Sequence, residues 1–264
     1  MLRISELKLP LDHAPEALPA AIAARLGVAP GDLLRWSVWK RAHDARRKSA
    51  ILKVYIVDAE VRGEAAVLAR HAGDIHINPA PDTTYRPPAP PPAGRLRPVV
   101  VGTGPCGLFA ALILAELGLR PIILDRGKDV RARTKDTWGL WRRSELNPES
   151  NVQYGEGGAG TFSDGKLYSQ IRDTRFLGRK VLTEFVAAGA PEEILTEAHP
   201  HIGTFRLVTM VESLRAKIEA LGGEYRFQHR VTDLELARGP GGAHRLRGVH
   251  LHTGEFLEAD QVVL

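Results

Sequence analysis

The feature that most constrains this chain is a glycine-rich turn between a short apolar strand and an apolar helix. The turn reads Gly-Thr-Gly-Pro-Cys-Gly over residues 102–107, and a compact predicted strand, 97–101, leads directly into it. The apolar residues that follow, 108–117, predict a helix. A strand, a G-x-G-x-x-G turn and a helix in this order open a βαβ unit that binds a dinucleotide.

Each glycine of the turn has its own physical role. Gly102 allows the tight strand-to-helix turn, Gly104 lets a pyrophosphate approach the backbone, and Gly107 lets the helix press against the sheet. Pro105 and Cys106 complete the turn at the helix N-terminus, where free N–H groups and a partial positive charge face the phosphates. A chance glycine turn is the alternative, and the flanking strand and helix weigh against it. For Cys106, we expect a small buried filler rather than a nucleophile.

A second buried strand, 121–124, ends on Asp125. A carboxylate at this position can accept hydrogen bonds from a ribose. Because Asp125 would repel a 2′-phosphate, it argues against NADP at this turn. Ribose binding alone does not separate FAD from NAD.

A second glycine-rich run covers residues 151–167, with five glycines between Gly155 and Gly165. Such a backbone can wrap closely around a flat or anionic ligand, whereas a plain surface loop is the alternative. After it, an apolar stripe predicts a helix over 205–221. Four predicted strands follow, over 224–229, 231–236, 246–251 and 256–264. This succession indicates a β-meander, whereas a plain NAD domain would alternate strands with helices.

The first 78 residues predict a separate small domain with the order βαββαβ, the ferredoxin-like arrangement. RNA-recognition domains share this topology, but the central strands here offer only Tyr55, Trp36 and Trp39 for stacking bases, which is weak support for RNA. The basic cluster of Lys40, Arg41, Arg46, Arg47 and Lys48 is expected in a loop between two strands. We expect this loop to be solvated, and the alternative is that it binds an anion or docks a domain. Residues 79–96 are rich in proline and predict an extended linker, with an SH3-type ligand as the alternative.

Composition excludes several classes of protein. A single cysteine excludes a disulfide framework, a Cys-x-x-Cys redox pair and a cysteine-rich zinc site, and we expect no metal centre. The longest apolar run, 108–115, is too short to span a bilayer, and charged residues interrupt the N-terminus where a signal peptide would be apolar. A net charge of +5 over 264 residues is weak evidence for nucleic-acid binding. We therefore expect a soluble cytoplasmic protein that does not contact a membrane.

With these segments in place, the chain resembles FAD-dependent oxidoreductases of the glutathione-reductase-like flavoprotein superfamily. More narrowly, it is similar to the bacterial FAD-dependent dehydrogenase family, also called NAD(P)/FAD-dependent oxidoreductases. The segments that carry the resemblance are 102–112, 124–127, 155–167 and 200–204, together with 40–41 and 44–48 in the first domain. The resemblance covers nearly the whole chain, and the run 155–167 is its most specific part.

The resemblance implies that FAD is bound non-covalently, with its pyrophosphate at residues 102–107. Asp125 would bind the adenosine ribose, Arg126 would lie along the AMP half, and Val231 would contact the adenine through its main chain. The loop 158–166 would pass near the pyrophosphate and flavin, through Gly158, Gly160, Thr161 and Ser163. Asp125 replaces the more usual glutamate, and Phe205 stands where the family pattern leads us to expect an aspartate.

Asp164 and Lys166 are weak catalytic candidates. A lysine near the flavin would stabilise its anionic reduced form, whereas a turn aspartate and a solvated lysine are the equal alternative. The Trp138 and Trp141 side chains, one turn apart on a basic helix, are expected to pack. Because the superfamily continues beyond the strand that ends this sequence, we expect the chain to be an N-terminal fragment.

The sequence thus predicts an α/β chain with three parts. A small ferredoxin-like α+β domain covers 1–78, a proline-rich linker covers 79–96, and a Rossmann-type FAD-binding domain with an inserted β-meander covers 97–264. The function expected is that of a FAD-dependent oxidoreductase acting on a small-molecule substrate, with NAD(P)H as a candidate electron donor. The alternatives are an NAD-dependent oxidoreductase, or a non-enzymatic module that binds a dinucleotide or contacts RNA.

Overall fold

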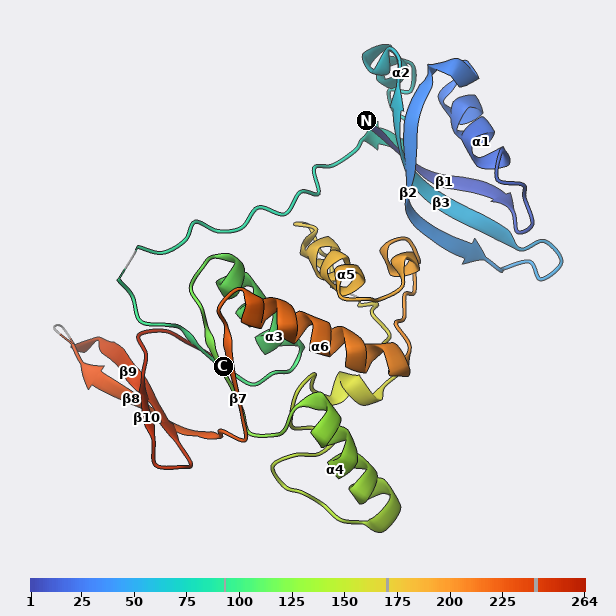
Figure 1. Cartoon of the computed structure of the whole chain (residues 1–264). Coiled ribbons are helices and arrows are strands. Elements are labelled where there is room, and N and C mark those ends of the chain that lie inside the picture. Colours follow the sequence, from blue (N-terminus) through green and yellow to red (C-terminus); the bar gives the residue numbers. More distant parts are fainter. Residues whose placement is uncertain (93, 170, 240–241) are drawn as a thin grey trace. The chain divides into compact units, whose positions relative to one another are not determined.

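The computed structural model describes residues 1–92, 94–169, 171–239 and 242–264. Figure 1 shows the helices and strands of a mixed α/β chain, which its internal contacts divide into two compact units. Unit 1 comprises Met1–Thr84, Leu167–Leu182 and Pro191–Pro200, and unit 2 comprises Tyr85–Lys166, Thr183–Ala190 and His201–Leu264. Within the described ranges, every helix is too short or too polar to cross a membrane.

Unit 1 has the predicted order of strands and helices. Its elements are β1 (Leu2–Pro10), α1 (Ala17–Leu26), β2 (Leu33–Asp44), β3 (Leu52–Val61), α2 (Glu64–Arg70) and β4 (Ile77–Pro79), with the 3₁₀ turn η1 (Pro30–Asp32) before β2. The strands pair antiparallel in the order β2-β3-β1-β4. Alternate strand residues such as Leu2, Ile4 and Val57 are fully buried and pack with Ile22 and Leu26 of α1, so one face of the sheet forms the core.

The edge strand β2 gains partners from far along the chain. The Arg41 N–H donates to the Thr196 carbonyl (2.7 Å), the Ala198 N–H donates to the Arg41 carbonyl (2.9 Å), and Arg41 pairs with Glu197. These contacts satisfy backbone groups that an edge strand leaves free. Residues 167–182 and 191–200, which the sequence assigned to the second domain, therefore belong with unit 1. These segments include the 3₁₀ turn η3 (Glu192–Leu195) and the first part of the helix α5 (Leu177–Ala187). The rest of α5, from Thr183, belongs to unit 2.

The basic cluster of unit 1 is only partly in a loop. Lys40 and Arg41 lie inside β2, which extends to Asp44, and only Arg46, Arg47 and Lys48 lie in the connection to β3. The longer strand places Asp44 beside the connection, where its carboxylate accepts hydrogen bonds from the Arg46 side chain. No helix or strand occurs among the described residues between β4 and β5, where the proline-rich linker was predicted.

Unit 2 contains a parallel and an antiparallel sheet. The parallel sheet has the order β11-β5-β6-β7, from β5 (Val99–Val101), β6 (Ile122–Asp125), β7 (Glu224–Phe227) and β11 (Val262–Val263). The antiparallel sheet is formed by β8 (Val231–Arg238), β9 (His244–Leu251) and β10 (Phe256–Glu258). The single strand predicted over 256–264 is thus wrong. It divides at the fully buried Ala259, so β10 completes the meander and β11 returns to pair with β5.

Three helices of the described residues lie wholly within unit 2. They are α3 (Pro105–Glu116), α4 (Val130–Arg143) and α6 (Thr204–Ala220), with the 3₁₀ turn η2 (Ala159–Phe162). The helix α3 contacts β5 and β6, α6 contacts β7, and α4 contacts α6. The helix α3 also packs against α6 (Figure 1). Of the predicted apolar stripe, Leu221 is exposed after the end of α6, whereas the other members are buried, namely Leu207, Val211, Leu214 and Ile218. A Cβ atom on Gly107 would overlap the Gly102 carbonyl oxygen, so α3 can start this close to β5 only with glycine there.

Candidate functional site

A cavity of about 290 Å³ lies at the carboxyl ends of β5 and β6 in unit 2. In sheets with parallel strands, ligands characteristically bind at this end of the strands. The cavity brings together six of the predicted binding residues, namely Gly102, Gly104, Asp125, Arg126, Gly158 and Val231. Residues without a predicted role complete its lining: Val101, Thr103, Leu124, Gln153, Tyr154, Gly155, His229 and Arg230.

The glycine turn presents unused backbone donors. Gly102 has a left-handed φ of 93°, and its N–H donates to the Leu124 carbonyl at 2.7 Å. Gly104 is the N-cap of α3 and supplies no side chain to cap the helix, whose first bond runs from the Leu108 N–H to the Gly104 carbonyl. In the described part of the chain, the N–H groups of Gly104, Cys106 and Gly107 donate to no protein acceptor. Such donors at a helix N-terminus suit a phosphate.

Asp125 ties the end of β6 to the glycine turn. Its buried carboxylate accepts hydrogen bonds from the Thr103 N–H (2.8 Å), from the Thr103 hydroxyl and from the Gly127 N–H (2.7 Å). A carboxylate has about four lone-pair positions, so these three donors leave about one for a ligand. The predicted ribose contact is therefore limited to a single hydrogen bond, and most of the carboxylate holds the turn in place.

The second glycine-rich run lies directly against the turn. The Gly157 N–H donates to the Thr103 carbonyl at 2.8 Å, and a Cβ on Gly158 would come within 3.2 Å of the Gly104 Cα. A Cβ on Gly127 would come within 2.6 Å of the Gly155 Cα. Glycines therefore allow the backbone of the second run to lie in direct contact with the glycine turn and with Gly127.

Other predicted residues lie outside the cavity lining. Pro105 and Gly107 form the first turn of α3. In and beside η2, Gly160 accepts a bond from the Ser163 hydroxyl (2.7 Å), and the buried Thr161 hydroxyl donates to the Glu156 carbonyl (3.5 Å).

Asp164 and Lys166 form an ion pair of 3.3 Å, with 55% and 64% of their side chains exposed. They line no part of the cavity. This arrangement favours the alternative of a turn aspartate and a solvated lysine, and a role of either residue at a flavin stays a prediction.

The expectation that Cys106 is buried is wrong, whereas the packing expected of Trp138 and Trp141 is found at the surface. Cys106 is exposed, because the first turn of α3 directs it outward while Gly107 and Leu108 face the sheet. Trp138 and Trp141 of α4 are 43% and 57% exposed. Each has a partner at the surface, since the Arg142 guanidinium lies 3.8 Å from the Trp138 ring centre and Trp141 meets Phe162 edge to face.

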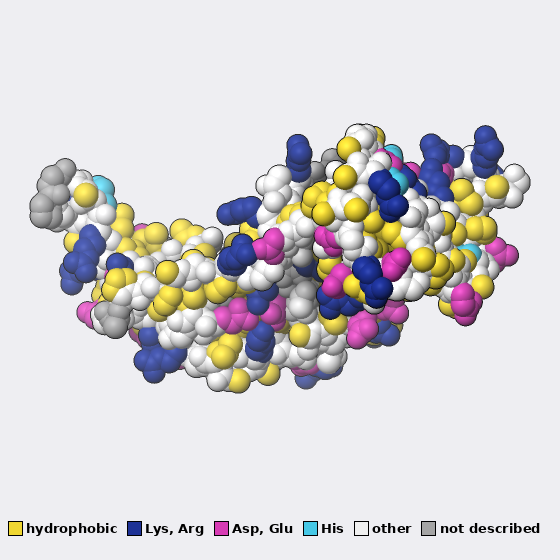
Figure 2. All heavy atoms as spheres, turned by 90° about the horizontal axis from the view of Figure 1, so that it is seen from above, with side chains coloured by type: hydrophobic (Ala, Val, Ile, Leu, Met, Phe, Trp, Pro, Cys, Tyr) yellow, Lys and Arg dark blue, Asp and Glu magenta, His cyan; other side chains and the backbone are white. Residues whose placement is uncertain are grey.

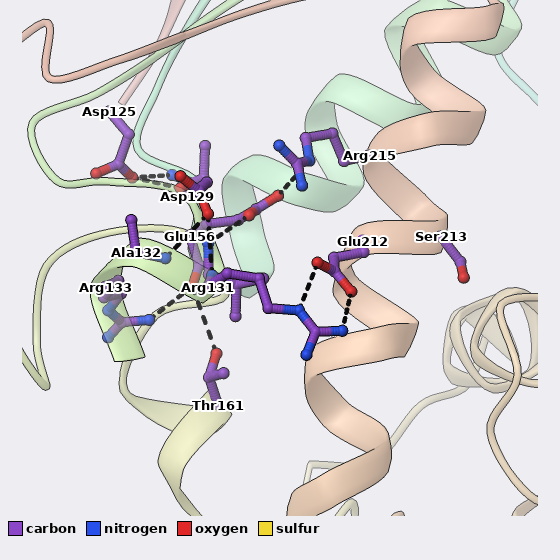
Figure 3. A network of polar contacts seen from close by, with 12 residues as sticks. Asp125, Asp129, Arg131, Ala132, Arg133, Glu156, Thr161, Glu212, Ser213 and Arg215 are labelled. Atoms are coloured by element: carbon purple, nitrogen blue, oxygen red, sulfur yellow. Dashed lines mark hydrogen bonds and ion pairs between the residues drawn. The ribbon is translucent and has the colours of Figure 1, made fainter. Parts of the chain in front are cut away.

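A fully buried arginine organises the wall of the site. Arg133 of α4 donates to four backbone carbonyls between residues 151 and 158 at 2.6–2.8 Å. Figure 3 shows it beside Glu156, another fully buried residue, whose carboxylate accepts from the Val130 N–H (2.8 Å) and lies 3.1 Å from Arg215 Nε of α6. Sequence reasoning missed both residues, because an arginine and a glutamate in polar surroundings look solvated.

Burial shifts the pKa of both the Arg133 and the Glu156 side chain. Desolvation lowers the pKa of Arg133 to about 10, although Asp125 and Glu156 favour its charged form. Desolvation raises the pKa of Glu156 to about 7, against the Val130 hydrogen bond and Arg215, which favour the carboxylate. Arg133 is therefore still a cation at neutral pH, whereas Glu156 titrates near it.

An aromatic residue completes the cavity. The Arg126 guanidinium lies 4.1 Å from the centre of the Tyr154 ring and pairs with Glu149 at 2.7 Å. Arg230 approaches the same Glu149 carboxylate at 3.4 Å, so one acid partly neutralises both arginines of the lining. The described residues contain no group of three His, Cys, Asp or Glu side chains placed to hold a metal ion.

Comparison with known proteins adds relatives of limited coverage. Residues 1–60 match a family described as a domain of unknown function, DUF8436. An "Uncharacterized protein" of Clostridium beijerinckii is 39% identical over 239 residues, which is 90% of this chain and 44% of the relative. The chain therefore spans less than half the length of the curated relative that it matches.

Solved structures with partial likeness include three whose coverage is similar. THI4 of Thermovibrio ammonificans is 18% identical with a TM-score of 0.41, over 63% of this chain and 55% of that one. An L-amino acid deaminase of Proteus vulgaris is 14% identical with a TM-score of 0.38, over 64% and 52%. A 3-ketosteroid dehydrogenase of Rhodococcus jostii is 17% identical with a TM-score of 0.34, over 64% and 45%. These scores and identities are too low to assign this chain a function.

Proposed function

We propose that the chain carries the cofactor-binding part of a FAD-dependent oxidoreductase and binds FAD non-covalently. In this proposal unit 2 is a Rossmann-type domain with an inserted meander, and unit 1 is a ferredoxin-like domain. The observation that carries the proposal is the cavity of unit 2, where unused N–H groups, close-packed glycines and Asp125 meet at the ends of parallel strands.

The residues present fit the ADP half of the cofactor. The N–H groups of Gly104 and Cys106 would face the pyrophosphate, and the remaining lone pair of Asp125 would accept one ribose hydroxyl. The apolar lining from Leu124, Val231 and Tyr154 suits an adenine ring. At about 290 Å³, the cavity lies at the small end of ligand sites, roughly 300–1,000 Å³, and is sized for part of a dinucleotide.

When bound, FAD supplies hydride and electron transfer, and the chain's own share is binding and orientation. The glycine turn and the run around Gly155 fix where the phosphates lie, and Asp125 fixes the turn. A small-molecule substrate and NAD(P)H as electron donor are part of the same proposal. The activity of a longer protein that contains this chain is likewise proposed only.

NAD is the second candidate cofactor, because the cavity fits the ADP half that FAD and NAD share. The observations for an RNA-contacting function are weaker than those for a nucleotide site. On the face seen in Figure 2, Lys and Arg side chains alternate with Asp and Glu rather than forming a continuous basic surface.

The proposal is tested by mixing the purified chain with FAD, desalting it and recording its absorption spectrum. We expect flavin bands near ~450 nm that survive desalting and disappear in Asp125→Ala. Asp233→Ala is the matched control, since Asp233 lies exposed on β8 of the same unit. No retained flavin, together with calorimetric binding of NAD, would replace FAD by NAD. Failure to bind either nucleotide would refute the proposed site.

A further inference from the structure

Arg133 is a buried cation without a paired acid. Its side chain is fully buried and donates hydrogen bonds to four neutral backbone carbonyls, those of Asn151, Val152, Glu156 and Gly158. No carboxylate of the described residues forms an ion pair with it. The four carbonyls replace part of the lost hydration, but a buried cation without a paired carboxylate still costs free energy.

The Arg133 guanidinium is separated from the proposed phosphate-binding turn by one residue, Gly158. Its Nη1 donates to the Gly158 carbonyl at 2.8 Å, and Gly158 is packed so tightly that a Cβ there would come within 3.2 Å of both Gly104 Cα and Pro105 Cδ. Gly155 is equally constrained, since a Cβ on it would come within 2.6 Å of Arg133 Cδ. The glycine-rich run is thus shaped to bring this arginine up to the turn.

A neutral side chain with hydrogen-bond donors could also hold the carbonyls of the run 151–158, whereas an arginine adds a fixed positive charge. In a poorly hydrated interior, such a charge acts over a longer distance than at the surface. The arginines that line the cavity itself, Arg126 and Arg230, share Glu149 and are partly neutralised by it. Of these three arginines, Arg133 is the one that forms no ion pair with a described carboxylate.

We propose that Arg133 is a positioning residue of the dinucleotide site, which holds Gly158 against the glycine turn and favours a pyrophosphate there by its charge. This inference rests on the proposed function, because it assumes that a phosphate occupies the turn. It predicts a selective role: Arg133 matters for the phosphate-bearing part of a ligand and not for its nucleoside.

Calorimetry with two probes, ADP and adenosine, tests the proposal on the wild-type chain and on Arg133→Met. We expect Arg133→Met to weaken ADP binding by about tenfold or more and to leave adenosine binding within about twofold, because only the phosphates would lose the fixed charge behind the turn and the tie that holds Gly158 there. Arg131→Met is the matched control, because Arg131 lies on the same helix, is exposed and pairs with Glu212; it should change neither affinity.

Equal weakening of ADP and adenosine, or no change in either, would overturn the role of Arg133. A wild-type chain that binds no ADP would instead refute the proposed function, so the two failures are distinct. If circular dichroism shows that Arg133→Met does not fold, Glu156→Gln measured at pH 8.5 replaces it. Removing this neighbouring negative charge should tighten ADP binding severalfold without changing adenosine, and an unchanged or weaker affinity for ADP would overturn the proposal.

Discussion

Glu156 is predicted to reduce the stability of the chain at neutral and alkaline pH. Its carboxyl group is fully buried between α4 and α6, and burial raises its pKa from 4.5 to about 7. The groups that face it are Asp129 of α4, Glu212 and Arg215 of α6, and the buried Tyr225 hydroxyl of β7. The two acids oppose ionisation and Arg215 favours it, so desolvation decides the direction.

The sign and size of the effect follow from this shift. The folded chain prefers protonated Glu156, so the stabilisation is complete below about pH 4.5 and is lost as the pH rises to about 7. At about 1.4 kcal/mol for each pH unit, the loss is about 3 kcal/mol. Glu156→Gln, which mimics the protonated acid and keeps an acceptor for the Val130 N–H, should therefore stabilise the chain by about 1–3 kcal/mol at pH 8 and by almost nothing at pH 4.5.

The assay is urea denaturation at several pH values, followed by tryptophan fluorescence. Trp138 and Trp141 of α4 report on unit 2, and Trp36 and Trp39 of β2 report on unit 1, so two transitions can be fitted to the fluorescence. Glu258→Gln is the control, since Glu258 is exposed on β10 and should show no gain at any pH. Destabilisation by Glu156→Gln at pH 8 would refute the reasoning, because the ionised carboxylate would then be held favourably by Arg215.

Two further predictions concern the frame of the site. Gly107→Ala should destabilise unit 2 by about 1–3 kcal/mol and abolish ADP binding, because a Cβ there overlaps the Gly102 carbonyl; Gly31→Ala, where a Cβ meets nothing, is the control in thermal melts, and equal melting temperatures would contradict the account. Asp129→Ala should cost about 1 kcal/mol, because Asp129 caps α4 through two N–H groups; a loss no larger than that of the exposed Asp233→Ala would show that the cap is dispensable.

Local signals made part of this molecule predictable. The glycine turn, the helix after it and Asp125 follow each other within one strand–helix–strand segment, so sequence spacing alone places them together. The close approach at Gly107 is also local, since it involves only the start of α3 and the end of β5. The sequence did not predict that Asp125 has little hydrogen-bonding capacity left for a ligand, because its bonds to Thr103 and Gly127 depend on side-chain geometry.

Non-local contacts were not predictable. Arg133 and Glu156 are polar residues in polar segments, and only the packing of α4, α6 and the glycine-rich run buries them. Likewise, the pairing of residues 196–198 with β2 joins segments more than a hundred residues apart, as the Arg41–Glu197 ion pair shows. Neither the burial of a charge nor a distant strand partner has a periodic signature in a single sequence.

The most direct test of the central claim is a titration of the purified chain with FAD, followed by flavin fluorescence and repeated with competitors. In the proposed function the cavity binds the ADP half, so we expect one saturable site from which ADP displaces FAD and FMN does not. Displacement by FMN but not by ADP, or the absence of any binding of FAD and ADP, would contradict the account.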